Sequence, residues 1–222
     1  MVRAILDGRK TQTRRVVKLP HNNPLGVWEP TTFGGPNGGK TRKGETIPEH
    51  CAIWHTRTGD CIGYPGVPGD KLWVRETWAL WDGGQHARKG EHGVSFRADC
   101  LNSRGVEDAD GLRCRNDYGV KWKPSIFMPR SASRITLEVT GVRVERLLEI
   151  TVEDAFAEGI LLKRCPDCHL AAYGLPEWGH DDLQKTPIEA YWHLWDQINE
   201  ARGFSRAKNP WTWVVEFKQV KS

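Results

Sequence analysis

Eleven tryptophans in a chain of 222 residues constrain the fold of this sequence more than any other feature. A tryptophan side chain carries a large apolar area that is costly to leave in water, so tryptophans that gather in the sequence mark the hydrophobic core. Two groups stand out, Trp73, Trp78 and Trp81, and Trp192, Trp195, Trp211 and Trp213. We therefore expect a core assembled from the middle of the chain and from its last third.

Strands are expected where apolar and β-branched residues alternate with polar ones. Residues 71–78 and 211–220 have this pattern, and residues 11–17 form a shorter segment of β-branched and basic residues. Apolar and polar residues also alternate over residues 133–148. Thr140-Gly141 interrupts this pattern, which predicts a strand pair bent at that point. These segments favour a fold rich in β-structure.

Three helices are indicated by their boundary residues. Residues 2–7 are apolar and helix-tolerant, and a glycine follows them. Thr151 opens a capping box, and Gly159 lies where that helix should end. Thr186 precedes Pro187, which suits the first position of a longer helix. Several strands combined with a few helices predict the α+β class.

Long stretches of low periodicity separate these elements. They are rich in Pro, Gly, Asn and charged residues, and they cover approximately 18–69 and 81–122. Both are longer than ordinary loops, which predicts inserted subdomains or mobile segments. A third, cysteine-containing loop covers approximately 161–185. We expect one domain, 1–222, that carries these insertions.

The formal net charge of +4 comes from 32 Lys and Arg against 28 Asp and Glu. This excess is too small to attract a polyanion when it is spread over the whole surface. Basic residues nevertheless gather in the first eighteen positions, which hold six of them and a single acid, Asp7. Such a patch could meet a phosphate backbone, and it could equally be a solvated face.

No stretch approaches the ~20 apolar residues of a membrane helix, and no signal peptide opens the chain, so we expect no membrane partner and a cytoplasmic protein. In a reducing cytoplasm the six cysteines are expected to be thiols or metal ligands. The chain also lacks a Walker loop, a dinucleotide glycine fingerprint, a Gly-x-Ser-x-Gly elbow and a His-Glu-x-x-His zinc motif.

The segment Gly-Arg-Lys-Thr-Gln-Thr-Arg-Arg at residues 8–15 resembles the signature of ASCH domains, with Thr13 in the position usually held by Glu. Its Lys-Thr-x-Thr form is similar to the small bacterial N4-acetylcytidine amidohydrolases. Four further blocks resemble phage and prophage ASCH proteins, residues 69–78, 122–130, 153–160 and 209–217. The resemblance implies a PUA-like β-barrel with flanking helices, a cleft for RNA or a modified nucleoside, and host cytoplasm if the chain is phage-encoded.

Lys10, Thr13 and Glu76 are the candidate catalytic residues. Glu76 falls on the same face of its predicted strand as Leu72 and Val74, so its carboxylate needs a cationic partner, for which Lys10 is the natural candidate. The triple resembles the Lys, Thr and Glu of the small amidohydrolases, in which a base-activated hydroxyl or water attacks an acyl carbon. Phosphate contact for the lysine, strand packing for the threonine and a structural ion pair for the glutamate remain open.

Four residues are candidate nucleic-acid contacts. Arg15, Lys123 and Arg130 could bind phosphates, and Trp78 could stack on a base. Solvation of the cations and core packing of the tryptophan are the alternatives.

Cys165-Pro166-Asp167-Cys168 has the spacing of a zinc knuckle, and His169 and His180 lie nearby in the sequence. Zinc favours four ligands, and no second Cys-x-x-Cys exists. Cys51, His55 and Cys61 could complete the set only if two insertions meet. A structural zinc is therefore possible at Cys165 and Cys168, with free thiols as the alternative and no cofactor otherwise required.

Three functions remain open from the sequence. The chain could be an amidohydrolase acting on an N4-acylated cytidine, with ribonuclease activity as a weaker variant. It could be a non-enzymatic reader of RNA or of a modified base. It could also be a phage interaction protein that acts on host nucleic-acid machinery.

Overall fold

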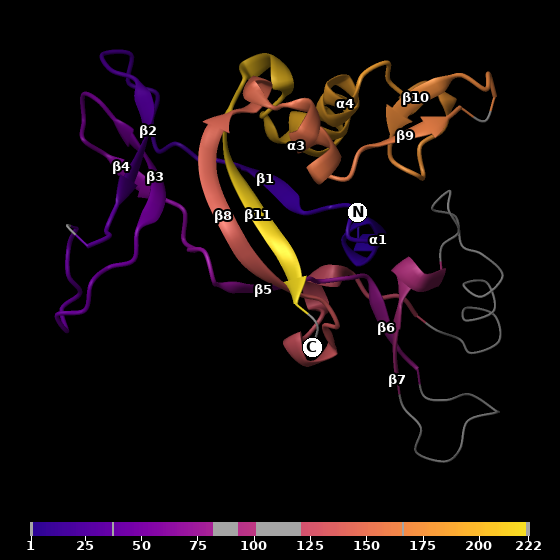
Figure 1. Cartoon of the computed structure of the whole chain (residues 1–222), viewed down its shortest axis with the longest axis horizontal. Coiled ribbons are helices and arrows are strands. Elements are labelled where there is room, and N and C mark those ends of the chain that lie inside the picture. Colours follow the sequence, from indigo (N-terminus) through magenta and orange to yellow (C-terminus); the bar gives the residue numbers. More distant parts are fainter. Residues whose placement is uncertain (1, 37, 82–92, 101–120, 166, 221–222) are drawn as a thin grey trace.

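The computed structural model describes residues 2–36, 38–81, 93–100, 121–165 and 167–220 (Figure 1). A curled, half-barrel-like sheet of four strands forms the centre of the molecule. It contains β1 (Gln12–Val16), β11 (Trp211–Val220), β8 (Thr136–Arg146) and β5 (Lys71–Trp73) in that order, with every neighbouring pair antiparallel. The α+β class is confirmed.

The two long strands β8 and β11 give the sheet its curvature. They pair along their whole lengths except for a register shift between Glu216 and Phe217. A bulge of this kind bends the strand and increases its twist. The expected strand pair at 133–148 is therefore wrong: β11 is long enough to pair with both halves, so they form one continuous strand whose irregularity is absorbed as the bulge.

The strand expected at 71–78 is interrupted. β5 ends at Trp73, residues 74–77 are not in a strand, and β6 (Trp78–Trp81) pairs with β7 (Gly93–Phe96) instead of the central sheet. Apolar and polar residues keep alternating through residues 74–77. β5 nevertheless pairs with β8 at only three positions, and the chain leaves the central sheet after Trp73.

The helices begin where the sequence predicts. Thr151 caps α3 (Val152–Ala157) by accepting a hydrogen bond from the Asp154 amide. Thr186 caps α4 (Pro187–Asn199), whose first residue is proline. α1 (Val2–Leu6) is followed by Gly8 at φ 71°. Short 3-10 helices complete the set at Arg97–Cys100, Ser125–Phe127, Arg130–Ala132, Leu147–Glu149, His180–Asp182, Glu200–Arg202 and Arg206–Lys208.

Both faces of the central sheet are covered. α3 and α4 lie over one face and bury a cluster that includes Ala155, Tyr191 and Trp195. A small sheet of β2 (Trp28–Phe33), β3 (His50–His55) and β4 (Cys61–Gly63) packs Trp28 and Ile53 on the other face. The expected insertion at 18–69 thus contains a folded three-stranded sheet, whereas most of the expected insertion at 81–122 lies outside the described residues.

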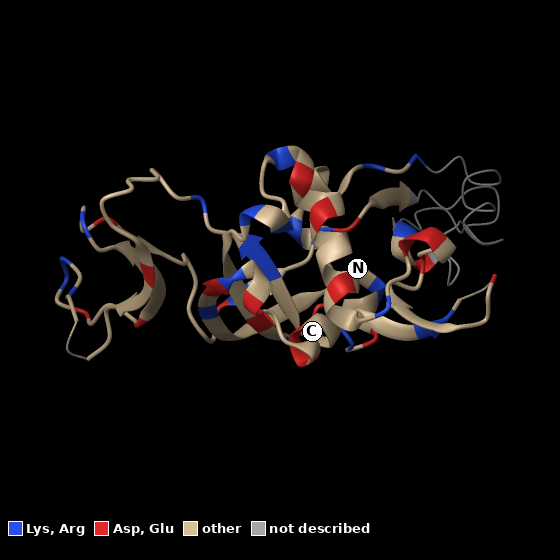
Figure 2. Cartoon of the chain, turned by 90° about the horizontal axis from the view of Figure 1, so that it is seen from above, with Lys and Arg blue, Asp and Glu red and all other residues tan. Residues whose placement is uncertain are grey.

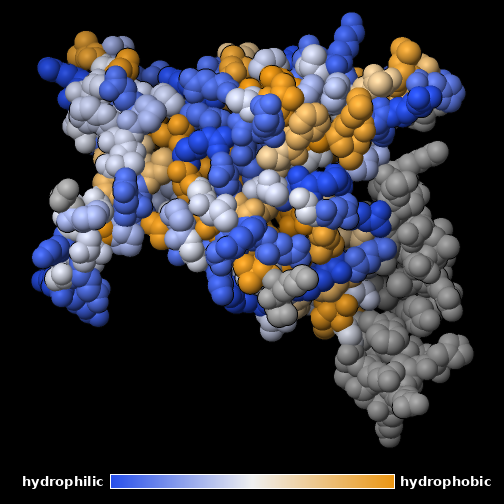
Figure 3. All heavy atoms as spheres, in the orientation of Figure 1, coloured by the Kyte–Doolittle hydropathy of each residue, from blue (hydrophilic) through white to orange (hydrophobic). Residues whose placement is uncertain are grey.

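The expected tryptophan core is confirmed for the C-terminal group. Trp195, Trp211 and Trp213 are buried, and Trp192 packs half-buried against the helical cluster. Apolar and hydrophilic residues are interspersed over the face shown in Figure 3. Within the part of the chain that is described, no helix has the length and apolar character required to cross a membrane.

Candidate functional site

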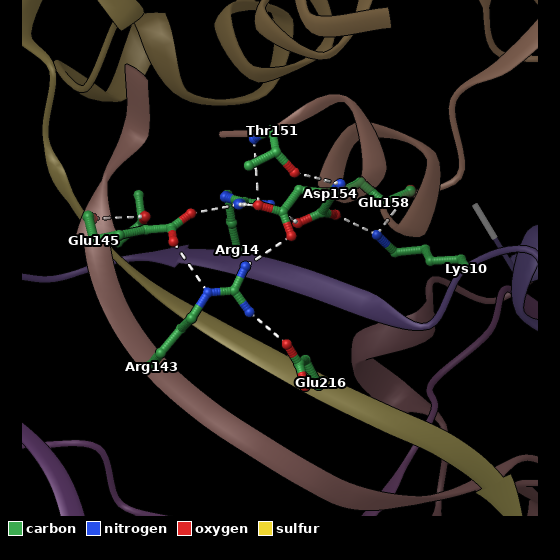
Figure 4. Close-up of polar contacts among 9 residues, drawn as sticks. Lys10, Arg14, Arg143, Glu145, Thr151, Asp154, Glu158 and Glu216 are labelled. Carbon is green, nitrogen blue, oxygen red and sulfur yellow. Dashed lines mark hydrogen bonds and ion pairs between the residues drawn. The ribbon is translucent and has the colours of Figure 1, made fainter. Parts of the chain in front are cut away.

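A network of charged side chains lies between the central sheet and α3, with Lys10 at its buried end (Figure 4). The Lys10 amine donates hydrogen bonds to Glu158 Oε2 at 2.5 Å and to the Glu158 carbonyl oxygen at 3.0 Å. Only 6% of Lys10 and 2% of Glu158 are exposed. Gly159 follows at φ 100°, a backbone conformation that favours glycine, and a Cβ there would lie only 3.3 Å from the Cβ of Ala4.

Arg14 occupies the middle of the network, and its side chain is fully buried. Its Nη2 donates to Asp154 Oδ2 at 2.9 Å and also to Glu145. Its Nη1 lies 3.6 Å from Glu158 Oε1, and its guanidinium carbon lies 5.6 Å from the centre of the Tyr191 ring. Burial opposes the charge of Arg14, but Tyr191 and Glu145 outweigh it, so the pKa of Arg14 is raised.

Arg143 forms the exposed end of the network. It donates from Nε to Glu145 Oε2 at 3.0 Å, from Nη2 to Asp154 Oδ1 at 2.7 Å, and from Nη1 to Glu216. Burial opposes ionisation of Asp154, yet Arg14 and Arg143 outweigh it and lower the pKa of the Asp154 carboxyl. Figure 2 shows that basic and acidic residues lie close together on the ribbon in the centre of the molecule.

Some buried polar atoms of this region retain unused hydrogen-bonding capacity. Gln12 Nε2 and Arg14 Nε have no hydrogen-bond partner among the described residues. Arg14 Nη1 and Glu158 Oε1 face each other as an ion pair at 3.6 Å, and the buried Tyr191 hydroxyl donates a hydrogen bond to the Glu158 carboxylate. Buried donors and acceptors are normally satisfied, and an unsatisfied group calls for a reason such as a bound water, ion or ligand. A bound water or a further polar group beside Gln12 and Arg14 would satisfy these atoms.

The expected pairing of Lys10 with Glu76 is wrong. Glu76, only 1% exposed, receives a two-pronged contact from Arg134, with Nε to Oε1 at 3.0 Å and Nη2 to Oε2 at 2.9 Å. Arg134 also donates to both oxygens of Asp99, at 2.6 and 2.8 Å. Burial disfavours the charged form of Arg134, but Glu76 and Asp99 outweigh this effect and raise the pKa of Arg134.

Thr13 does not complete a triple with Lys10. Arg14 is buried toward α4, and successive residues of a strand point to opposite faces, so Thr13 points away from the network. Strand alternation does place Gln12 and Arg14 on one face, a signal that could have drawn attention to Arg14. Glu158 and Arg134 were missed because no local pattern links them to their partners.

The four expected nucleic-acid contacts have different surroundings. Arg15, Lys123 and Arg130 are exposed. Trp78 is only 5% exposed, and the Lys123 amine lies 5.0 Å from the centre of its ring. The expectation that Trp78 offers an open stacking face is therefore wrong, because core packing and Lys123 already cover it.

Cys165, Cys168 and His180 form a cluster that could bind a metal ion. Their candidate ligand atoms all lie within 4.8 Å of one another, and Cys165 Sγ lies 3.0 Å from His180 Nδ1. Hydrogen bonds from the Cys168 backbone and from His180 lower the pKa of the Cys165 thiol to about 6. The cluster closes the turn between β9 (Leu161–Arg164) and β10 (Ala171–Gly174).

The other ligands considered from the sequence do not join this cluster. Cys51 and His55 belong to β3 and Cys61 to β4, which lie at the opposite side of the molecule from β9 and β10 in Figure 1. His55 is buried and contacts the Asn23 carbonyl at 3.2 Å.

Comparison of the chain with protein-family models, with curated proteins and with solved structures finds no match.

Proposed function

We propose that the protein is an ASCH-type binding protein with a PUA-like fold, for RNA or a modified nucleoside, whose site is centred on Lys10, Arg14 and Glu158. The observation that carries this proposal is the unused hydrogen-bonding capacity at Gln12 Nε2 and Arg14 Nε, beside the buried pair of Lys10 and Glu158. The Watson–Crick edge of a base presents both donors and acceptors, and so complements a cation next to a carboxylate. The motif at residues 8–15, which contributes Lys10, is the second support.

The reaction proposed for this site is hydrolysis of an N4-acylated cytidine-type base. The Glu158 carboxylate would take a proton from a water molecule while the oxygen of that water attacks the acyl carbon. The Lys10 ammonium would stabilise the oxyanion, and a proton would pass to N4 as the carbon–nitrogen bond breaks. Water and the acylated base thus give a carboxylic acid and the free base. Thr13, on the other face of β1, has no part in this scheme.

Access to the site is proposed from the Arg143 end. The Arg143 side chain is 37% exposed and that of Glu216 is 47% exposed, whereas Lys10, Arg14 and Glu158 are almost enclosed. A ligand would first contact Arg143. It would then replace contacts within the network, step by step toward the buried end at Lys10.

The test combines ligand binding with turnover. N4-acetylcytidine, cytidine and a short single-stranded RNA are titrated by calorimetry, and the acetylated nucleoside is incubated with protein and followed by mass spectrometry. Lys10→Ala and Glu158→Gln should each reduce turnover by at least ~100-fold. Glu76→Gln, which alters the other buried carboxylate, is the matched control and should leave turnover unchanged.

The outcomes separate the possibilities. Binding that is lost in Lys10→Ala, without turnover by the wild type, makes the site a reader. If Glu76→Gln and Glu158→Gln reduced turnover equally, the active site would have to be placed at Glu76 instead. A wild type that neither binds nor hydrolyses any of the three ligands would contradict the proposal.

We also propose that Cys165, Cys168 and His180 bind a structural Zn²⁺. Thiolate and imidazole are ligands that zinc prefers, and the cluster joins a Cys-x-x-Cys turn to the segment that leads into α4. Such an ion would fix the β9–β10 hairpin against the rest of the chain.

Metal analysis of protein purified without chelator should find about one zinc per chain. Cys168→Ser should lose it, while Cys61→Ser, an exposed cysteine outside the cluster, should retain it. Protein without zinc, or equal loss in both variants, would rule the site out.

A further inference from the structure

A groove of about 850 Å³ separates the β2–β3–β4 sheet from the outer edge of β8. Val142 and Val144 of β8 form one wall, and Thr31 and Thr32 of β2 contribute to the other. Val67 and Pro68 line the groove just before β5. Its volume falls in the range of sites that bind ligands.

The wall formed by β8 is an unpaired strand edge. β5 pairs with β8 at Thr136 to Glu138, and the backbone of Val139 bonds to Gly69 and Asp70 just before β5. Beyond Val139, no strand among the described residues pairs with this outer edge.

The hydrogen bond from the Leu147 amide to the Pro210 carbonyl fixes the alternation of the β8–β11 ladder. Counting back from Leu147 to the bulge, the odd-numbered residues of β8 form the backbone hydrogen bonds to β11. The N–H and C=O groups of Val142 and Val144 therefore point away from β11, toward the groove.

The outward direction has independent support at Val144. The Val144 amide donates a hydrogen bond to the sulfur of Cys51, which lies in β3 on the groove side. The amide and carbonyl of Val142 have no hydrogen-bond partner among the described residues. Val142 is half-buried in the groove, and unpaired outward groups of this kind are a template for another strand.

The charges of the groove disfavour a nucleic acid there. Arg143 contributes to the lining, but its guanidinium is committed to Glu145, Asp154 and Glu216 on the other face. The other charged lining residue is Glu49, which has no ion pair among the described residues. A phosphate backbone would find no available cation, whereas a basic side chain would find a carboxylate.

We propose that this groove binds an extended peptide segment of a partner protein, which adds to the free edge of β8 as a further strand. Val142 would exchange backbone hydrogen bonds with the segment, as in β-strand addition. Its side chains would be apolar where they meet Val67 and Pro68, with a Lys or Arg opposite Glu49. This interaction surface is separate from the proposed nucleoside site.

The probe is the tightest-binding sequence from an arrayed library of random eight-residue peptides, measured in solution with the full chain. Val142→Pro removes the outward amide but leaves the ladder with β11, since that amide points away from it. It should weaken binding about tenfold or more, because one hydrogen bond and the strand approach are lost. Val142→Ala, the matched control, keeps the amide and should bind within about threefold of the wild type.

A second measurement does not depend on the folding of the proline variant. Methylation of each peptide amide in turn should weaken binding at alternate positions only, because successive amides of a strand point in opposite directions. The proposal fails if no peptide binds below about 1 mM, if methylation shows no alternation, if folded Val142→Pro binds normally, or if an eight-nucleotide uridine RNA displaces the peptide.

Discussion

Glu158 and Glu76 are two carboxylates that are equally excluded from water but differently used. Both oxygens of Glu76 are occupied by the Arg134 guanidinium, at 2.9 and 3.0 Å. Glu158 gives one oxygen to Lys10, its other oxygen lies 3.6 Å from Arg14 Nη1, and the Tyr191 hydroxyl also donates to the carboxylate. Burial of a charge therefore does not by itself distinguish the two carboxylates. They differ in that a single arginine holds both oxygens of Glu76, whereas three side chains share Glu158.

The surroundings of the two carboxylates differ in the same way. Glu158 follows α3 and faces the central sheet, where its neighbours are Arg14 of β1 and Lys10 of the segment that leads into β1. Glu76 lies between β5 and β6, and its partner Arg134 also binds Asp99 of the 3-10 helix after β7. The Glu76 pair thus fastens peripheral segments together, while Glu158 lies where elements of the core converge.

The largest expected effect is that of Glu158→Gln on stability. It should lower the free energy of unfolding by about 3–5 kcal/mol, because the buried Lys10 ammonium loses its counter-ion. Urea denaturation followed by tryptophan fluorescence measures this change. Glu177→Gln, at an exposed glutamate, is the control and should leave the denaturation midpoint unchanged. A small loss in Glu158→Gln would mean that water already reaches Lys10.

Glu76→Gln should cost less, about 2 kcal/mol, against the ~3–5 kcal/mol usual for a broken buried pair. Arg134 retains Asp99, and its side chain is 29% exposed, so it remains partly compensated and solvated. The same denaturation experiment gives the value. If Glu76→Gln proved more costly than Glu158→Gln, the contrast drawn between the two carboxylates would be reversed.

Asp154→Asn should have a smaller effect that depends on pH. Burial opposes ionisation of Asp154, but Arg14 and Arg143 lower its pKa in the folded chain. An ordinary Asp in the unfolded chain has a pKa near 3.9. The carboxylate therefore stabilises the fold fully above about pH 4, and this contribution disappears as the pH falls further. Melting curves of both proteins should differ most near neutrality and converge in acid. A difference that persists at low pH would point to lost packing instead.

The smallest stability change is expected when both partners are replaced. Lys10→Met combined with Glu158→Leu should stay within about 1 kcal/mol of the wild type, because similar-sized apolar side chains remove both desolvated charges together. Ligand binding should nevertheless be lost. A double variant as unstable as Glu158→Gln alone would show that the pair is required for the fold.

Local features of the fold could be predicted from the sequence because their causes are local. Thr151 and Thr186 cap helices through hydrogen bonds to residues three positions away. The tryptophans of α4 and β11 share the apolar side of their own elements, and so their burial follows from periodicity. The end of β5 at Trp73 does not, because it depends on how much of β8 is available for pairing.

For the ion pairs of the candidate site, only one partner of each pair could be predicted from the sequence. Lys10 follows from the motif, and Gln12 and Arg14 follow from strand alternation. Their partner Glu158 is 148 positions away from Lys10, and Arg134 is 58 positions away from Glu76. Several carboxylates compete for each cation, so the choice depends on three-dimensional packing that a single sequence does not reveal.

The position of β11 in the sheet has a consequence for how the chain is made. β11 lies between β1 and β8, so residues 211–220 join one of the first strands synthesised to one from the middle of the sequence. Until those residues leave the ribosome, β1 and β8 have no neighbour between them, and Val139 and Val144 lack the facing tryptophans. Assembly of the central sheet must therefore follow synthesis of its last strand, with slow closure of long loops. During that interval the edges of β1 and β8 that later pair with β11 are exposed, a condition that favours aggregation.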